Sequence, residues 1–201
     1  MPKFPDLLVL SENKKLTSTD LYKKGLFEIQ DINSQRVSIF TDPKPGMFVI
    51  DACAGSGGKT LHLATLMQNK GHILAIDPSE EKRKQLKIRT IRNGISIINQ
   101  DSSENNNIIK KNKESADVLL IDAPCSGLGV LKRNPAAKWH MNPNRINQLI
   151  VLQQEILQRY SPLVSTGGLL IYATCSIFPN ENQNQIKRFL NSKNGKLFSL
   201  L

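Results

Sequence analysis

The sequence predicts an α/β protein built on a mostly parallel sheet with helices on both faces. Short apolar runs alternate along the chain with longer segments of helical periodicity, as in parallel strands joined by right-handed crossovers. The apolar runs are nearly continuous, which indicates strands that are buried on both faces. With 201 residues and a hydrophobic content of 39%, the chain suits one domain whose core needs no disulfides.

The expected elements follow in order along the chain. Five strands are expected, at residues 47–50, 72–76, 95–99, 117–121 and 168–173. Helices are expected at residues 60–68, 79–93 and 145–163, with a further short helix after Asp31. We divide the chain into an N-terminal extension, residues 1–46, that packs on a main domain, residues 47–201. The Asn- and Lys-rich tail after residue 180 is expected to lack a last structural element.

The charge balance limits the kinds of partner. Lys and Arg number 27 against 17 Asp and Glu, a net charge of +10 that indicates either a nucleic-acid partner or a solvated basic surface. The basic stretch 82–92 is interpreted as an exposed crossover helix. No apolar run is long enough to span a membrane, and the first residues lack the pattern of a signal peptide, so we expect a cytoplasmic monomer.

Acids and a thiol follow the expected strands. Asp51, Asp77, Asp101 and Asp122 lie at or just after the first four strands, and Cys175 follows the fifth. Ligands of parallel sheets bind beyond the carboxyl ends of the strands, so these side chains predict one organised site. The three cysteines form no C-x-x-C pair, which argues for free thiols and against a metal site.

A glycine-rich loop lies between the first strand and the first main helix. Its residues are Cys53, Ala54, Gly55, Ser56, Gly57, Gly58 and Lys59. A phosphate-binding P-loop would need glycine at position 53, and the dinucleotide fingerprint also fails to match. Asp77, 20 residues after Gly57, can accept the ribose hydroxyls of an adenosine cofactor. Because Asp51 suits a cationic ligand better than a pyrophosphate, the loop favours S-adenosylmethionine.

Two cysteines follow neighbouring strands and should face one cleft. Cys125 comes after the fourth strand and Cys175 after the fifth. A thiolate that adds to carbon 6 of cytosine makes carbon 5 nucleophilic toward a methyl sulfonium, and a second thiol can assist release. Asp122 can supply the proton or hydrogen bond that this addition needs at N3, while Lys59 or Lys138 can lower the thiol pKa. This reasoning leaves open which cysteine attacks.

Five segments in this order resemble the Sun-type (NOL/NOP/Sun) RNA cytosine-5 methyltransferases. They are QDINSQ at 30–35, DACAGSGGKT at 51–60, DAPCSG at 122–127, KRNPAAKW at 132–139 and ATCS at 173–176 with Glu181-Asn182. The resemblance implies a Rossmann-like fold, S-adenosylmethionine as cofactor and RNA as substrate, with ribosomal RNA favoured over transfer RNA. It also implies that Cys175 is the nucleophile and that Cys125 aids product release. The loop 53–59, Asp77, Asp101 and Asp122 match cofactor-binding positions, with Asp101 near the adenine.

The chain departs from that family pattern in two places. The loop has Ala54-Gly55-Ser56 where the family has Ala-Ala-Pro, and the final antiparallel strands of the family are not expected before Leu201. Lys132, Arg133 and Lys138 with Trp139 suit phosphate contact and base stacking, or else a surface loop with a packed Trp. The alternative functions are an RNA-binding remnant without catalysis and a P-loop nucleotide hydrolase.

Overall fold

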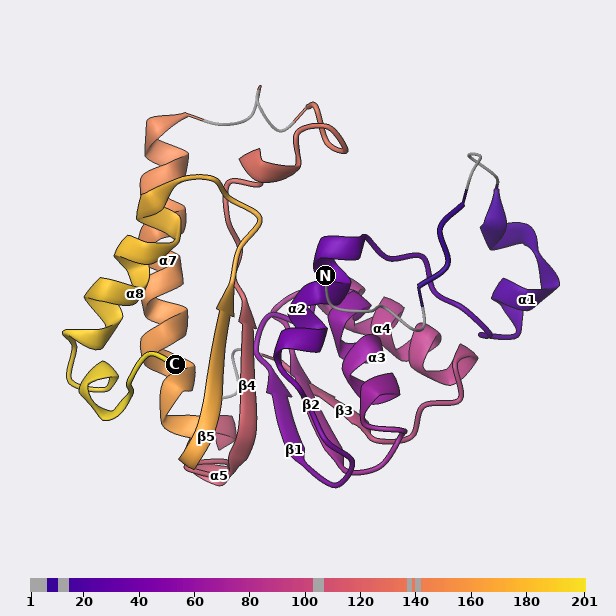
Figure 1. Ribbon diagram of the computed structural model, residues 1–201, viewed down its shortest axis with the longest axis horizontal. Helices are drawn as coiled ribbons and strands as arrows, with labels where there is room; N and C mark the ends of the chain where they lie inside the picture. Colours follow the sequence, from indigo (N-terminus) through magenta and orange to yellow (C-terminus); the bar gives the residue numbers. More distant parts are fainter. Residues whose placement is uncertain (1–6, 11–14, 103–106, 137–138, 140–141) are drawn as a thin grey trace.

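A computed structural model describes residues 7–10, 15–102, 107–136, 139 and 142–201. Its centre is a five-stranded sheet in the order β3-β2-β1-β4-β5, in which every pairing is parallel (Figure 1). The strands are β1 (Phe48–Asp51), β2 (His72–Ile76), β3 (Ile98–Asp101), β4 (Ala116–Asp122) and β5 (Val164–Ala173). The strand order reverses between β1 and β4, so the carboxyl ends of these two strands open a crevice. The predicted α/β class is thereby confirmed.

Helices of eight or more residues flank the sheet, and the chain also forms shorter helical segments. The α-helices are α1 (Asp20–Lys23), α2 (Ile32–Phe40), α3 (Gly58–Leu66), α4 (Glu80–Arg92), α5 (Asn107–Lys111), α7 (Pro143–Tyr160) and α8 (Gln183–Leu190). Single 3-10 turns are η1 (Leu16–Ser18), η2 (Leu128–Val130), η3 (Ser161–Leu163), η4 (Pro179–Glu181) and η5 (Gly195–Leu197). Within the described residues, no helix is long and apolar enough to cross a membrane.

Two apolar layers, one on each face of the sheet, form the core. Successive strand residues point to opposite faces, so Val49 packs with Leu63 of α3 while its neighbour Ile50 packs with Leu157 of α7. In Figure 1, α3 and α4 cover one face and α7 and α8 cover the other. This double cover explains why the strands read as continuous apolar runs.

The tail after residue 180 differs from expectation, because it forms α8. This helix packs on α7 through the buried side chains of Gln185 and Phe189. The Gln185 amide donates to the Ile150 carbonyl oxygen at 2.7 Å and to Gln153 Oε1 at 2.8 Å. Ile186, Phe189 and Leu190 lie at helical spacing and form a short apolar stripe, which the Asn- and Lys-rich composition of the segment obscured. No strand follows β5 in residues 174–201, in agreement with the predicted absence of the final strands, whereas helix α8 was not predicted.

Several boundaries also move for local reasons. Helix α7 begins at Pro143 because Asn142 caps it by accepting from the Arg145 backbone N–H, and it ends at Tyr160, two residues before Pro162. Strand β5 begins at Val164, four residues before the predicted start, and continues through Gly167 and Gly168. Strand β3 lies three residues later than its apolar run suggests.

The basic helix α4 is not simply a solvated face. Arg89 and Arg92 turn toward Glu28 of the N-terminal segment and form ion pairs with its carboxylate. Asn93 donates to the same carboxylate at 2.7 Å, and the Arg92 guanidinium lies over the Tyr22 ring. The interpretation of residues 82–92 as an exposed helix therefore fails for its last turn, where the arginines bind residues 22–28.

Candidate active site

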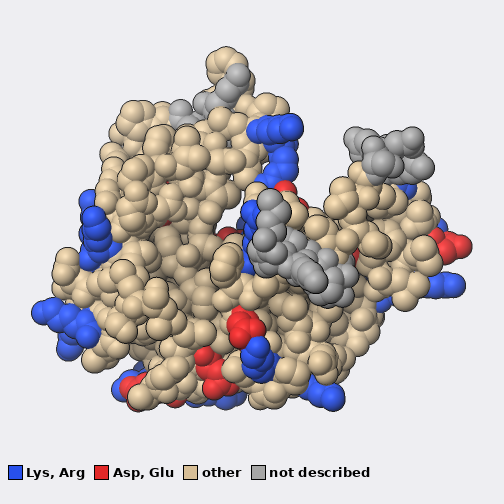
Figure 2. All heavy atoms as spheres, in the orientation of Figure 1, with Lys and Arg blue, Asp and Glu red and all other residues tan. Residues whose placement is uncertain are grey.

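The carboxyl edge of the sheet borders a cavity of about 680 Å³. In the space-filling view the molecule is hollowed between the part that carries α7 and α8 and the part that carries α2 and α3 (Figure 2). The predicted site residues that line it are Asp51, Cys53, Ala54, Gly55, Ser56, Gly58, Lys59, Asp77, Asp122, Cys125 and Cys175. The structure thus brings together both predicted cysteines and most of the predicted cofactor positions.

The glycine loop, residues 52–57, is held mainly by backbone geometry. Gly57 has φ +89°, and a Cβ there would lie 2.2 Å from Leu86 Cδ1 of α4, so the position requires glycine. Asp77 Oδ2 accepts from the Gly55 N–H at 2.9 Å, and its Oδ1 accepts from the Ser79 N–H at 2.9 Å. Arg89 donates to the Ser56 carbonyl oxygen at 2.7 Å. The loop is therefore tied to β2 and α4.

Asp51 is a buried carboxylate at the end of β1, only 1% exposed. Thr60 donates to its Oδ2 at 2.7 Å, whereas Oδ1 has no hydrogen-bond partner among the described residues. Burial raises the pKa of Asp51 to about 6, against the lowering effect of the Thr60 hydrogen bond. An ionised oxygen without a partner at a cavity wall fits the ammonium or sulfonium of S-adenosylmethionine.

Cys125 and Cys175 form a close pair of thiols. Their Sγ atoms are 3.3 Å apart, and the Cys175 N–H lies 3.3 Å from Cys125 Sγ. The hydrogen bond from Cys125 lowers the pKa of Cys175 to about 7, and the positive charge of Lys59 acts in the same direction. The same bond, together with burial, raises the pKa of Cys125. Either sulfur can donate in this pair, so the choice of Cys175 as the attacking thiol rests on the family resemblance.

Lys59 and Asp122 form an ion pair inside the cavity. Lys59 Nζ lies 2.5 Å from Asp122 Oδ2, and both side chains are partly buried. The third cysteine, Cys53, is different, because burial and then the charge of Asp51 raise its pKa. Cys53 is thus an unreactive thiol in the cavity wall, while Lys59 is available to influence Cys175.

Other wall residues were not among the predicted site residues, although Ser34 lies in the QDINSQ segment of the resemblance. Helix α7 contributes Leu152, Glu155, Ile156, Arg159 and Tyr160, and α2 contributes Ser34. The α7 residues recur at helical spacing, so their pattern indicated only a packed face. Glu181 was also missed as a support of the site, although it lies in a segment that carries the family resemblance. Its carboxylate is fully buried behind both cysteines.

Some predicted site residues lie elsewhere. Gly57 and Asp101 do not line the cavity, and the Asp101 backbone oxygen receives the Asp77 N–H at 3.4 Å. Lys132 and Arg133 are exposed, and Arg133 forms an ion pair with Asp31 at 2.7 Å. Trp139 is 78% exposed, which does not match a packed Trp. Lys138 lies outside the described residues.

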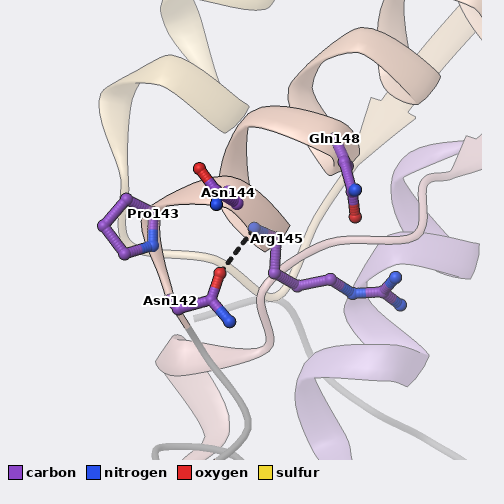
Figure 3. A pocket seen from close by; sticks show the side chains of 5 residues that line it. All are labelled: Asn142, Pro143, Asn144, Arg145 and Gln148. Carbon is purple, nitrogen blue, oxygen red and sulfur yellow. Dashed lines mark hydrogen bonds between the residues drawn. The ribbon is translucent and has the colours of Figure 1, made fainter.

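A smaller hollow of about 430 Å³ lies at the beginning of α7 (Figure 3). It is lined by Asn142, Pro143, Asn144, Arg145 and Gln148. The Asn142 side chain accepts from the Arg145 backbone N–H at 2.9 Å, as Figure 3 shows, so this residue serves as the helix cap. None of the predicted catalytic or cofactor residues reaches this hollow, and we place the active site in the larger cavity.

The fold and the cavity define the class of the protein. A parallel sheet in the order 3-2-1-4-5, with a glycine loop after β1 and an acid after β2, is the Rossmann-like fold of S-adenosylmethionine-dependent methyltransferases. The sequence model described as 16S rRNA methyltransferase RsmB/F matches residues 38–200. The chain belongs to this family. S-adenosylmethionine is the cofactor of the family, as the glycine loop and the resemblance predicted.

Named relatives agree with this placement. A probable ribosomal RNA small subunit methyltransferase B from Synechocystis is 38% identical over 176 residues, which are 87% of this chain and 40% of the relative. A methyltransferase homologue from Pyrococcus horikoshii is 34% identical with a TM-score of 0.78, covering 90% of this chain and 56% of that one. NSun6 from Pyrococcus horikoshii, solved with SFG, is 28% identical with a TM-score of 0.81, covering 89% and 45%. The chain spans about 40% of the length of the curated relatives it matches.

Proposed function

We propose that this chain transfers a methyl group from S-adenosylmethionine to carbon 5 of a cytosine in RNA, with ribosomal RNA as the favoured substrate. The observation that carries the proposal is the pair of thiols 3.3 Å apart at the wall of the cofactor cavity. Methyl transfer to oxygen or nitrogen needs no thiol, whereas carbon 5 of cytosine becomes nucleophilic only after a thiolate adds at carbon 6. The names of the relatives, which refer to small-subunit ribosomal RNA, support RNA as the substrate.

The two thiols and the ion pair divide the chemical work. The Cys175 thiolate forms the bond to carbon 6, and the electron pair moves through the ring toward N3 and carbon 5. The Lys59–Asp122 pair holds a proton in the cavity that can compensate the charge at N3. When bound, S-adenosylmethionine supplies the electrophilic methyl group. Once Cys175 is bound to carbon 6, Cys125 releases its own proton to solvent and, as a thiolate, removes the proton from carbon 5. The electron pair of that C–H bond re-forms the double bond to carbon 6 and expels the Cys175 thiolate.

Substitution of each thiol should separate these roles. Cys175→Ala should abolish methyl transfer to RNA from radiolabelled S-adenosylmethionine, because no adduct forms. Cys125→Ala should instead accumulate a covalent protein–RNA complex that resists denaturing electrophoresis. Cys175→Ala should still bind S-adenosylmethionine in calorimetry. This binding serves as the control that the variant is folded. Full turnover by Cys175→Ala would disprove the mechanism.

The substrate and the cellular setting are also part of the proposal. We place the activity in the cytoplasm and expect a monomer in which residues 1–46 support the catalytic domain, residues 47–201. Lys132, Arg133, Lys138 and Trp139 are proposed to contact RNA. Bisulfite sequencing of total RNA from cells with and without the gene identifies the modified cytosine. Loss of a site in ribosomal RNA would support the proposal, whereas loss of a site in transfer RNA alone would change the substrate.

A further inference from the structure

Glu181 lies behind the two cysteine loops, residues 123–127 after β4 and 174–178 after β5. Its side chain belongs to the turn η4 and is fully buried, with an exposed fraction of 0%. Oε1 accepts from the Ser126 backbone N–H at 2.8 Å, and Oε2 accepts from the Ser126 hydroxyl at 2.5 Å. Oε2 also accepts from the Ser176 hydroxyl. Since Ser126 follows Cys125 and Ser176 follows Cys175, one carboxylate binds the neighbour of each thiol.

Further contacts fix the carboxylate itself. Gln153 of α7 donates from Nε2 to Glu181 Oε1 at 3.0 Å and to the Pro124 carbonyl oxygen at 2.9 Å. Tyr172 of β5 donates from its hydroxyl to the Glu181 backbone oxygen at 2.9 Å. Glu181 therefore has partners on α7, on β5 and in both cysteine loops. Because the Glu181 side chain is fixed by these contacts, its hydrogen bonds hold the Cys125 loop at a fixed distance from the Cys175 loop.

The charge of Glu181 is stabilised by these donors and not by a cation. Within the described parts of the chain, no Lys or Arg forms an ion pair with it. Burial acts to raise the pKa of Glu181, yet the hydrogen bonds from Ser126, Ser176 and Gln153 outweigh it and lower the pKa. A buried carboxylate without these donors would be strongly destabilising, so folding favours the arrangement in which both loops reach Glu181.

The neighbouring Asn182 performs a narrower task. Its amide donates to the Ser176 and Phe178 carbonyl oxygens at 3.0 Å each, and its Oδ1 accepts from the Thr174 hydroxyl at 2.5 Å. All three partners belong to the Cys175 loop. Asn182 thus shapes one loop, whereas Glu181 joins the two.

We propose that Glu181 is a positioning residue that sets the separation of the Cys125 and Cys175 thiols by hydrogen-bonding the residue after each of them. Its catalytic meaning rests on the proposed function, but the geometric statement does not. Without Glu181 the two loops separate, the thiol–thiol hydrogen bond is lost, and Cys175 loses the contact that favours its thiolate. The groups that act on Cys175 are Cys125, Asp122 and Lys59, and none of them is substituted in Glu181→Gln.

The test measures the reactivity of Cys175 in Glu181→Gln, which keeps the size of the side chain and removes its charge. Iodoacetamide alkylation of Cys175 is followed from about pH 5.5 to 9.5, with mass spectrometry separating the three cysteines. In the wild-type protein we expect a midpoint near pH 7. In Glu181→Gln we expect it to rise by about one unit, toward the ordinary thiol value of about 8.5.

The sign of this shift separates positioning from simple electrostatics. Removal of a nearby negative charge would by itself lower the pKa of a thiol, because it favours the thiolate. A midpoint that rises despite the loss of charge therefore reports the loss of the thiol–thiol contact. A midpoint that is unchanged or lower in folded Glu181→Gln would overturn the proposal.

Two sets of variants keep the test decisive. Val164→Ala, at the opposite end of β5, lowers stability without touching either loop, and its midpoint should match the wild type. Ser126→Ala and Ser176→Ala each remove one hydroxyl tie and should raise the midpoint by less than Glu181→Gln. If Glu181→Gln fails to fold, these serine variants decide, and wild-type midpoints in both would refute the proposal.

The readout also distinguishes this proposal from the proposed function. Alkylation is measured without RNA and without turnover, so it remains informative if the wild-type chain methylates no RNA. If the chain is active, Glu181→Gln should lower kcat by about tenfold and leave the KM for S-adenosylmethionine unchanged. An increase in that KM with an unchanged kcat would instead assign Glu181 to support of the cofactor cavity.

Discussion

The glycine loop and the cysteine loops border the same cavity but are held in different ways. The glycine loop depends on backbone conformation, with Gly57 at φ +89° and the Gly55 N–H bound to Asp77. The cysteine loops depend on side chains from elsewhere in the fold, above all on the buried carboxylate of Glu181. The partners of the glycine loop lie 22 and 33 positions away, whereas Glu181 lies 55 positions from Ser126.

The two kinds of loop therefore depend on different parts of the fold for their final conformation. The glycine loop can form once β1, β2 and α4 have packed, because its partners lie within this part of the chain. The cysteine loops reach their final geometry only when α7, β5 and η4 have all packed. Substitutions in the first region should therefore affect cofactor binding, and those in the second region should affect thiol chemistry.

The largest effect is expected for Asp51→Asn in the cofactor-free protein. The folded-state pKa of about 6 lies above the unfolded value of about 3.9, so the folded state binds more protons between these pH values. The protonated Asp51 carboxyl therefore contributes its full share to the free energy of unfolding below about pH 4, and this share is lost as the pH rises through about 6. Asn lacks this penalty, so the variant should be more stable than the wild type at pH 7, by up to about 3 kcal/mol.

Thermal unfolding from pH 4 to pH 8 measures this difference. The gain of Asp51→Asn should shrink toward pH 4, while its affinity for S-adenosylmethionine should fall because the carboxylate is gone. If the melting temperatures of the wild-type protein and of Asp51→Asn changed in parallel with pH, the buried Asp51 carboxylate would not destabilise the folded state.

The second effect tests the cysteine loops. Cys125→Ala removes the thiol that lowers the pKa of Cys175, so that pKa should rise from about 7 toward about 8.5. The alkylation midpoint of Cys175 should follow by more than one unit, and the affinity for S-adenosylmethionine should stay the same. If the midpoint stays at pH 7, Lys59 rather than Cys125 controls the thiolate.

The third effect tests the glycine loop. Gly57→Ala forces a Cβ into the left-handed region and against Leu86, at a conformational cost of about 1–2 kcal/mol. Calorimetry should show cofactor affinity reduced by about tenfold, with no change in the Cys175 alkylation midpoint. Gly167→Ala is the matched control, since Gly167 has φ +80° with open space around its Cβ position and does not line the cavity. Equal loss of affinity in both variants would contradict a local role for Gly57.

The smallest effect is expected at the contact between the N-terminal segment and α4. Glu28→Gln weakens the ion pairs with Arg89 and Arg92, which are partly exposed, so the loss should be about 1 kcal/mol. The melting temperature should fall by about 2–4 °C. Cofactor affinity should fall slightly, because Arg89 also binds the Ser56 carbonyl oxygen. Lys84→Gln, which removes an exposed ion pair on the same helix, should leave both quantities unchanged.

Most of the fold could be predicted because its signals are local. Apolar runs indicated all five strands, and their carboxyl ends indicated where Asp51, Asp77 and Cys175 would lie. The boundaries shifted where capping or glycine overrode apolar periodicity, as at Asn142 and Gly167. Helix α8 was missed because its short apolar stripe of Ile186, Phe189 and Leu190 lies in an Asn- and Lys-rich segment.

The site was predictable in its chemistry but not in its supports. The spacing of Cys125 and Cys175 after adjacent strands placed them at one cleft, yet nothing local indicated that Cys125 would lower the pKa of its partner. Glu181, Arg89 and Glu28 act through contacts between segments that are distant in the chain. Such contacts form only when the helices pack on the sheet, so a short stretch of sequence gives no sign of them.

Asp77 holds the Gly55 and Ser79 N–H groups even though no cofactor is needed for either bond. The carboxylate proposed to receive the ribose hydroxyls therefore already organises the loop on which the rest of the cofactor would lie. Ordering a loop on binding costs conformational entropy, which is subtracted from the affinity. Here the two bonds to Asp77 form on folding, so we expect S-adenosylmethionine to bind with less of this entropy cost and without a slow loop-closure step.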